Sequence, residues 1–197
     1  MKEIKVRATF TEEILGMSPN NQDLYREFIA NKAGEAESIE EEVARIGLDG
    51  VEDKGKTVFP RTDDGVPFLY DYQIRGFFKD SAGMLRRVKG SESSKLKAYK
   101  KIIDGLIFVK DRMNPIVCSG QVGECVRPLR AQTMQGDRVA LAVSETCPAG
   151  SHIDFTVMLF DNSYEKAVIE WLDYGAVRGL GQWRNSGKGT FTYEILS

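Results

Sequence analysis

Strict alternation of apolar and polar positions predicts β-strands at four places in the chain. These are residues 4–10, 138–143, 153–160 and 190–196. Successive side chains of a strand point to opposite sides of a sheet, so alternation indicates that one side covers a core. We expect the last three segments to be strands of one antiparallel sheet.

Apolar residues at helical spacing predict helices elsewhere. The predicted helical segments are residues 21–32, 38–46, the stretch from Gly76 to Val88, and 165–177. In the first of these pieces Leu24, Phe28 and Ile29 share one side. The last carries Ala167, Val168, Trp171 and Leu172 on one side, which predicts a helix packed against the sheet.

The remaining segments are shorter or less regular. Residues 57–59 and 106–109 are candidate short strands, and residues 47–65 are otherwise predicted as a loop. Residues 114–135 show no clear periodicity and are interrupted by glycine and proline, so we expect a long loop or a hairpin insertion. Strands and helices mix without regular alternation. This order predicts an α+β fold with a ferredoxin-like (RRM-type) antiparallel sheet, helices on one face and loop insertions.

Length and composition exclude several classes of protein. The chain has 197 residues, of which 42% are hydrophobic and 28% charged, as in ordinary globular domains. No apolar run approaches the roughly twenty residues of a membrane span, and the first ten residues lack the apolar core of a signal peptide. We therefore expect a cytoplasmic protein that does not contact a membrane. Its three cysteines are few and odd in number, which favours reduced thiols over a set of disulfide bonds. The cysteines and His152 do not form the closely spaced ligand pairs that are typical of a zinc site.

The formal net charge of −2 conceals a segregation along the chain. Residues 1–74 hold 9 Lys and Arg against 16 Asp and Glu, whereas residues 75–130 hold 13 against 5. Residues 131–197 hold 5 against 8. A basic middle between acidic flanks indicates a surface for an anionic partner, although a solvated surface explains many such runs.

The most distinctive stretch is the C-terminal segment from Gly175 to Leu196, where glycines alternate with basic residues between a predicted helix and a predicted strand. Its glycines and basic residues are Gly175, Gly179, Gly181, Gly187, Gly189, Arg178, Arg184 and Lys188. Glycine lets backbone N–H groups approach phosphate oxygens, and the cations add charge-assisted hydrogen bonds. This layout suits a polyanion, and a mobile surface loop with incidental charge is an equally weighted alternative.

Catalytic chemistry has little support. His152 is the chain's one histidine, and Ser151 and Asp154 beside it cannot complete a hydrolase triad through sequence proximity. Glu12, Glu13 and Asp23 follow the first strand and could hold a metal for phosphodiester cleavage, but scattered surface carboxylates are the commoner explanation. No phosphate-binding or dinucleotide fingerprint is present, and we expect no cofactor.

Four motifs in sequence resemble the RAMP superfamily of CRISPR-associated proteins, in particular the backbone subunits that coat guide RNA. They are QIRGFFK with MLR (residues 73–79 and 84–86), LIFVKD (106–111), ETCPAGSHIDF (145–155) and GLGQWRNSGKGTFTYEIL (179–196). The resemblance covers about residues 68–197 and the first strand. Where the family has a serine-rich turn, this chain has YQIRG at residues 72–76, as a diverged relative, for instance one encoded by a virus, would.

The resemblance implies one RAMP-like domain over residues 1–197, with an acidic helical insertion at about 20–55. A loop or short thumb-like insertion falls at about 114–136. It also implies a non-catalytic protein that holds single-stranded or guide RNA and associates with CRISPR effector subunits or copies of itself. The implied RNA-binding residues are Arg75, Lys79, Arg86, Arg87, Arg178, Gly179, Gly181, Trp183, Arg184, Gly187 and Lys188. Trp183 could stack on a base or, equally, anchor the loop in the core.

Two other functions remain open. An anti-CRISPR-type mimic would join or block a CRISPR effector through protein contacts, using the acidic segment at residues 35–53. A metal-dependent ribonuclease would rely on Asp23.

Overall fold

The computed structural model describes residues 1–20, 56–133 and 136–196. The chain divides into two compact units. The first comprises Met1–Ile14, Pro60–Val122 and Cys147–Ser197, and the second comprises Leu15–Phe59 and Gly123–Thr146. The helices predicted at residues 21–32 and 38–46 lie outside the described residues.

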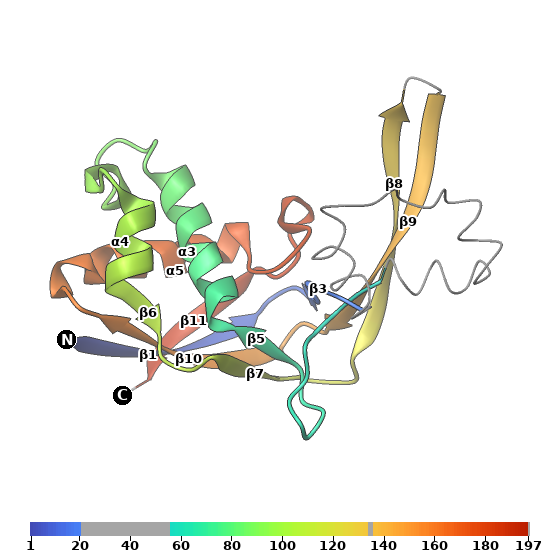
Figure 1. The fold of residues 1–197 in the computed structure, drawn as a ribbon, viewed down its shortest axis with the longest axis horizontal. Coiled ribbons are helices and arrows are strands. Elements are labelled where there is room, and N and C mark those ends of the chain that lie inside the picture. The colour runs from blue at the N-terminus through green and yellow to red at the C-terminus, as the bar shows by residue number, and fades with distance from the viewer. Residues whose placement is uncertain (21–55, 134–135, 197) are drawn as a thin grey trace, which may run out of the picture. The chain divides into compact units, whose positions relative to one another are not determined.

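The first unit is built on an antiparallel sheet whose central strands are the longest (Figure 1). Its strand order is β11 (Phe191–Leu196), β1 (Lys2–Phe10), β10 (His152–Leu159), β7 (Met113–Val117) and β5 (Phe68–Tyr70), with β6 (Ile107–Val109) also paired to β10. In β1 the residues Ile4, Val6 and Ala8 are buried while Lys5 between them is exposed. The alternation read from the sequence therefore marks the two faces of this sheet.

Three helices cover one face of that sheet (Figure 1). They are α3 (Asp71–Leu85), α4 (Tyr99–Leu106) and α5 (Glu165–Arg178). Of three short 3-10 turns, η1 (Ser93–Lys95) lies between α3 and α4, η2 (Asn162–Tyr164) precedes α5, and η3 (Arg184–Ser186) follows it. Trp171 of α5 is fully buried against Phe78 of α3, with ring centroids 5.6 Å apart. Burial of such large apolar side chains stabilises the layer by about 1.5–3 kcal/mol each. The predicted α+β class with helices on one face is confirmed.

Helix α3 begins earlier than the sequence predicts. It starts at Asp71 rather than after Gly76. The side-chain oxygen of Gln73 accepts a hydrogen bond from the Tyr70 amide at 2.8 Å, which satisfies a donor at the helix start. Asp71 adds a negative charge in the first turn, where the helix dipole favours it. Gly76 therefore lies inside the helix and not at its boundary.

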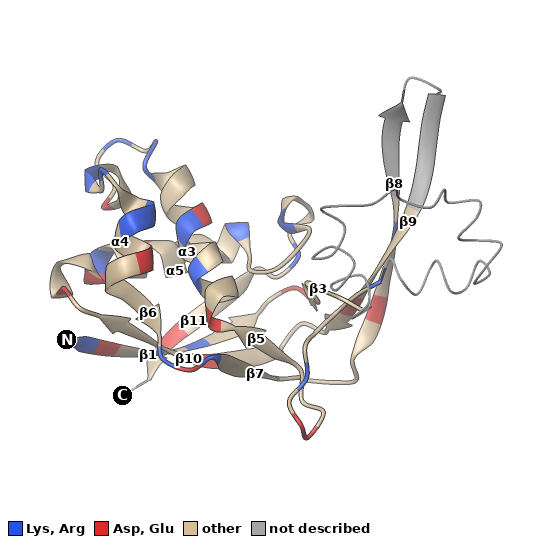
Figure 2. Cartoon of the chain, viewed as in Figure 1, with Lys and Arg blue, Asp and Glu red and all other residues tan. Residues whose placement is uncertain are grey.

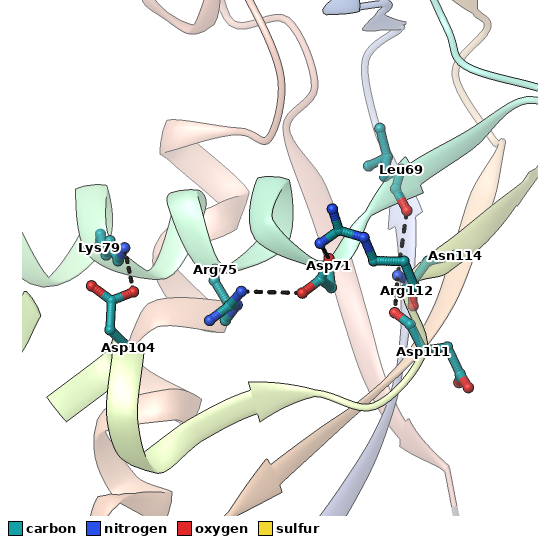
Figure 3. Close-up of polar contacts among 8 residues, drawn as sticks. All are labelled: Leu69, Asp71, Arg75, Lys79, Asp104, Asp111, Arg112 and Asn114. Atoms are coloured by element: carbon teal, nitrogen blue, oxygen red, sulfur yellow. Dashed lines mark hydrogen bonds and ion pairs between the residues drawn. The ribbon is translucent and has the colours of Figure 1, made fainter. Parts of the chain in front are cut away.

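The expectation for residues 114–135 as a loop is wrong for β7 and for β8 (Gly123–Thr133). Strand β8 forms a hairpin with a strand that begins at Gly136, whereas β7 pairs with β5 and β10 of the first sheet. In β7 the residues Asn114 and Ile116 are buried and their neighbours are exposed. The Asn114 amide donates to the Leu69 and Asp111 carbonyl oxygens at 3.3 and 3.0 Å (Figure 3). A polar residue thus fills a buried position, which hides the alternation from a reading by hydrophobicity.

The second unit contains a separate sheet. Its strand order is β2 (Ile14–Leu15), β9 (Gly136–Cys147), β4 (Thr57–Val58) and β3 (Ser18–Pro19), with β8 also paired to β9. The expectation that residues 138–143 share a sheet with β10 and β11 is wrong, because this strand pairs with β8 from Thr133↔Gly136 to Gly123↔Thr146. Strands consecutive in sequence commonly pair, and a short connection makes that pairing the local solution.

Candidate functional site

Lysines and arginines gather along α3, on α4 and in the loop that follows α5 (Figure 2). That loop runs from Gly179 to Thr190, between α5 and β11. These three elements belong to the first unit. Of the eleven residues expected to bind RNA, two lie in α3, two follow it directly, one ends α5 and six lie in the loop.

Asp80 of α3 connects the helix to the loop. Arg178 Nε, at the end of α5, donates to Asp80 Oδ2 at 2.7 Å. Arg184 Nη1 donates to the same oxygen, also at 2.7 Å. The hydrogen bond to Asp80 raises the pKa of Arg178, so this guanidinium is charged at any physiological pH. One carboxylate therefore gathers two arginines that lie six residues apart in the sequence.

The two arginines line a pocket of about 230 Å³, here termed the loop pocket. Its lining residues are Arg178, Gly181, Gln182, Trp183, Arg184 and Asn185. Arg178 Nη1 also donates to the Asn185 side-chain oxygen at 3.0 Å, which ties the end of α5 to η3 in the loop. The wall is thus polar and cationic with one aromatic ring.

Trp183 has an unusual backbone. Its φ of 53° and ψ of 33° place it in the left-handed region, and within residues 1–20, 56–133 and 136–196 it is the one non-glycine residue with positive φ. Such a conformation costs a bulky residue about 1–2 kcal/mol. The side chain is 38% exposed. The loop therefore holds a large aromatic ring at the pocket at an energetic cost, as functional sites often do.

A second, larger pocket of about 420 Å³ lies between α3 and α4 and is termed the helix pocket. Its lining residues are Lys79, Asp80, Gly83, Met84, Arg87, Tyr99 and Lys100. The guanidinium of Arg86 stands over the Tyr99 ring at 5.6 Å, and a Cβ at Gly83 would come within 3.1 Å of the Tyr99 hydroxyl oxygen. Asp80 belongs to this pocket and pairs with arginines of the loop pocket, so the two pockets adjoin.

Two of the expected RNA-binding residues lie along α3 in ion pairs (Figure 3). Arg75 donates to Asp71 at 3.1 Å, and Lys79 pairs with Asp104 of α4 at 2.5 Å. Arg112 shares the Asp71 carboxylate from the other side. Arg75 lines neither pocket and its guanidinium stands 5.8 Å from the Phe108 ring centre, so the structure gives it a packing role.

Lys188 is paired with two carboxylates of the same unit. Its Nζ lies 2.7 Å from a carboxylate oxygen of Glu13 and 3.8 Å from one of Glu12. This pairing holds the last part of the loop against the segment that follows β1. Lys188 therefore does not line the loop pocket with Arg178 and Arg184.

The loop glycines differ in what surrounds them, although all four have positive φ. Gly179 and Gly189 have φ of 75° and 70°, and a Cβ at either would meet backbone atoms at 2.5 and 1.9 Å, so they let the two arms of the loop touch. The Leu180 amide donates to the Gly189 carbonyl oxygen at 2.8 Å across that contact. Gly181 and Gly187 also have positive φ, and a Cβ at Gly187 would meet nothing within 4 Å.

Several residues of this surface were not selected from the sequence. Asp80 is the principal one, and Tyr99 and Lys100 of α4 complete the helix pocket. A signal for Asp80 exists, because residues 75–91 contain five basic residues and this one carboxylate. A single acidic residue among basic ones indicates an ion pair. Only the fold shows that its partners are Arg178 and Arg184, at the end of α5 and in the loop.

Two of the residues considered for catalysis, Ser151 and Asp154, make structural contacts in the described part of the chain. Ser151 is buried and its hydroxyl donates to the Pro148 carbonyl oxygen at 2.6 Å, which stabilises the turn before β10. Asp154 is engaged by Arg7 through two hydrogen bonds of 2.8 and 2.7 Å, the main cause of its lowered pKa. Among the described residues no group of three or more His, Cys, Asp or Glu could hold a metal ion. Asp23 lies outside them.

No helix of the described part of the chain is long and apolar enough to cross a membrane.

Comparisons with known proteins give a likeness of fold. No family model and no curated protein matches the chain. A solved structure described as the Type III-B Cmr-beta bound to cognate target RNA contains a chain with a TM-score of 0.53 and 10% identity; the match covers all of this chain and 60% of that one. A Type IV-B CRISPR complex (TM-score 0.49, 11% identity, 100% and 91% covered) and Cmr6 from Pyrococcus furiosus (0.48, 12%, 98% and 98%) also match. At this identity the first match shows a shared fold, which agrees with the expected RAMP-type architecture.

Proposed function

We propose that this chain is a non-catalytic RNA-binding protein that holds a single strand of RNA across the loop pocket and the helix pocket. The observation that carries the proposal is Trp183, held in a left-handed conformation with its ring partly exposed beside Arg178 and Arg184. Stacking of a base on an aromatic ring contributes about 1–3 kcal/mol and tolerates any base.

The charges around Trp183 suit the rest of a nucleotide. A base stacked on the indole ring brings its phosphates within reach of the two guanidinium groups, which form paired hydrogen bonds with phosphate oxygens. Asp80 orients both arginines in the absence of RNA. The Asp80 carboxylate competes with an incoming phosphate for the same two arginines, so it lowers the affinity for RNA. Because salt screens the charges that hold the phosphate, RNA should be released more readily as the salt concentration rises.

The helix pocket would take the adjoining part of the strand. Its volume of about 420 Å³ suits a nucleotide-sized group. Tyr99 and Met84 offer ring and thioether surface to a base, and Lys79, Arg87 and Lys100 offer cations to phosphates. Single strands are favoured over duplex because both pockets present ring surface to unstacked bases.

The proposed partners follow from the shared fold. A chain with this architecture occurs in an RNA-bound Cmr-beta structure, which supports single-stranded or guide RNA as the ligand. It supports CRISPR effector subunits or further copies of this chain as protein partners. The alternatives of an anti-CRISPR-type mimic and a ribonuclease depend on residues 35–53 and on Asp23, which lie outside the described residues.

A titration of labelled single-stranded RNA at several salt concentrations tests the proposal. The variant Arg87→Ala/Arg184→Ala removes one exposed cation from the helix pocket and one ion-paired cation from the loop pocket. The matched control Lys5→Ala/Arg7→Ala removes the same charge from strand β1, on the side of the sheet away from the helices.

Each phosphate contact to a single strand contributes about 0.7 to the slope of log affinity against log salt. We expect the pocket variant to bind all RNA sequences more weakly and to reduce that slope by up to about 1.4, with the control close to the wild type. Equal losses of RNA affinity in the two variants would show that RNA binds through nonspecific charge attraction and not at the pockets. An unchanged affinity in the folded pocket variant would show that RNA does not use this face.

A further inference from the structure

The thiols of Cys118 and Cys147 lie in contact. Their Sγ atoms are 2.7 Å apart, although 29 positions separate the two residues in sequence. A disulfide bond is about 2.05 Å long, so a movement of less than about 1 Å would join the sulfurs. Neither residue takes part in the proposed RNA-binding pockets.

The backbone around the two cysteines holds this approach in place. Cys118 follows β7, and Cys147 ends β9 just before the Pro-Ala-Gly turn. The Ser119 amide donates to Ser151 Oγ at 3.1 Å, and the Ser119 hydroxyl donates to the Ala149 carbonyl oxygen at 2.8 Å. The segments that follow the two cysteines are therefore hydrogen-bonded to each other, so the sulfurs meet through the fold and not through one flexible side chain.

We propose that Cys118 and Cys147 form a reversible disulfide bond when the protein meets a small disulfide oxidant such as glutathione disulfide. Cys118 is half-buried and Cys147 fully buried, so the oxidant reaches Cys118 first. The Cys118 thiolate attacks one sulfur of the oxidant, and glutathione leaves as its thiolate. The Cys147 thiolate then attacks Cys118 Sγ and expels the second glutathione.

The exchange balances without another reactant. Two protein thiols are oxidised to one disulfide, and one glutathione disulfide is reduced to two glutathione molecules that take up the two protons. The second step is fast because the attacking sulfur is already in contact with its target.

The position of the bond gives it a consequence for the chain. It would join the two places where the chain leaves the first unit, after Val122, and returns to it, at Cys147. The loop it closes contains all of β8 and β9 up to Cys147. A disulfide restricts the unfolded chain more strongly when its loop is long, so the oxidised protein should unfold at a higher urea concentration than the reduced protein.

The chain has three cysteines, and Cys125 of β8 provides the matched control. Purified protein is equilibrated in glutathione buffers of increasing oxidised fraction, quenched with an alkylating agent, and analysed by intact mass and peptide mapping. We expect the free thiols to fall from three to one, with loss of two hydrogen atoms, a peptide linking Cys118 to Cys147, and recovery of all thiols in dithiothreitol. The Cys125→Ser variant should behave in the same way, with both its thiols consumed.

The Cys118→Ser variant should keep its two thiols and show no rise of the urea midpoint on oxidation. It replaces a half-buried side chain and avoids the fully buried Cys147. Three free thiols in the most oxidising buffer, a bond that involves Cys125, or a stable glutathione adduct on Cys118 without ring closure would each overturn the proposal.

Discussion

Asp80 shows how a single carboxylate organises a basic surface. Its two oxygens accept hydrogen bonds from Arg178 and Arg184, which converge from the end of α5 and from η3. The sequence identifies these arginines as candidates because they stand among glycines, but a counter-ion one hundred residues away can be found only in the fold. The cations of this surface were therefore predictable, and their partners were not.

The first prediction concerns the Asp80→Asn variant. The amide keeps the shape of the side chain and removes the negative charge that competes with phosphate. Two unit charges about 4 Å apart in water interact by about 1 kcal/mol, which corresponds to about fivefold in affinity. We expect RNA binding to tighten by about that factor at low salt and to converge with the wild type at high salt.

The Asp154→Asn variant is the control for this measurement, because it removes the same charge from the opposite side of the sheet. RNA titration by fluorescence anisotropy measures both. Weaker binding by Asp80→Asn would mean that orienting the arginines matters more than competition with phosphate.

The second prediction concerns Tyr193 of β11, whose hydroxyl donates to Asp173 at 2.8 Å. Burial, together with this bond, raises the pKa of Tyr193 to about 12. The unfolded chain has a tyrosine pKa of about 10, so the folded state keeps a proton that the unfolded state loses between about pH 10 and 12. The contribution of Tyr193 to stability is therefore complete below about pH 10 and is lost as the pH rises to about 12.

Urea unfolding at pH 9 and pH 11 measures this effect. The wild type should lose more of its free energy of unfolding between the two values than Tyr193→Phe does. An equal loss in both proteins would show that the phenol titrates alike in the folded and unfolded states.

At the scale of elements, the strands and helices with the most regular spacing of apolar residues were predicted most accurately. Strands β10 and β11 and helix α5 were predicted within a residue or two because their apolar positions repeat without interruption. Strand β7 was missed because a polar residue, Asn114, fills a buried position, where its amide nitrogen donates to two backbone carbonyl oxygens. Strand β9 was found but assigned to the wrong sheet, because alternation reveals a strand and does not reveal its neighbour.

The third prediction compares two glycines of the same loop. Gly187 and Gly189 have φ of 80° and 70°, so alanine is strained at both. At Gly187 the added Cβ meets nothing, and we expect a loss of about 1–2 kcal/mol in the free energy of unfolding. At Gly189 it would lie 1.9 Å from the Leu180 carbonyl oxygen, and we expect a loss of about 3 kcal/mol or more.

Chemical denaturation of the two alanine variants gives the comparison directly. Equal losses would mean that the two arms of the loop separate easily, and that the close contact between Leu180 and Gly189 is not required for the fold.

At the scale of the whole molecule, the proposed function includes assembly. A backbone-type subunit binds one RNA strand in several copies, so the fourth prediction is that RNA length sets the mass of the complex. Light scattering with single strands of increasing length should show steps of one chain mass. Particles that hold one copy at every length, with free protein that is strictly monomeric, would contradict this part of the proposal.

The most direct test of RNA binding at the loop pocket uses the chain's two tryptophans, since only one of them should sense the RNA. Trp171 is fully buried and its indole N–H donates to Ser93 at 2.8 Å, whereas Trp183 is partly exposed in the pocket. At saturation with single-stranded RNA, confirmed by anisotropy of a labelled strand, we predict quenching of the wild type and almost none of Trp183→Phe. An abasic strand should bind more weakly and quench less, because it offers no base to stack. Saturation without quenching of the wild type, or equal quenching of Trp183→Phe, would contradict the claim that Trp183 stacks on RNA.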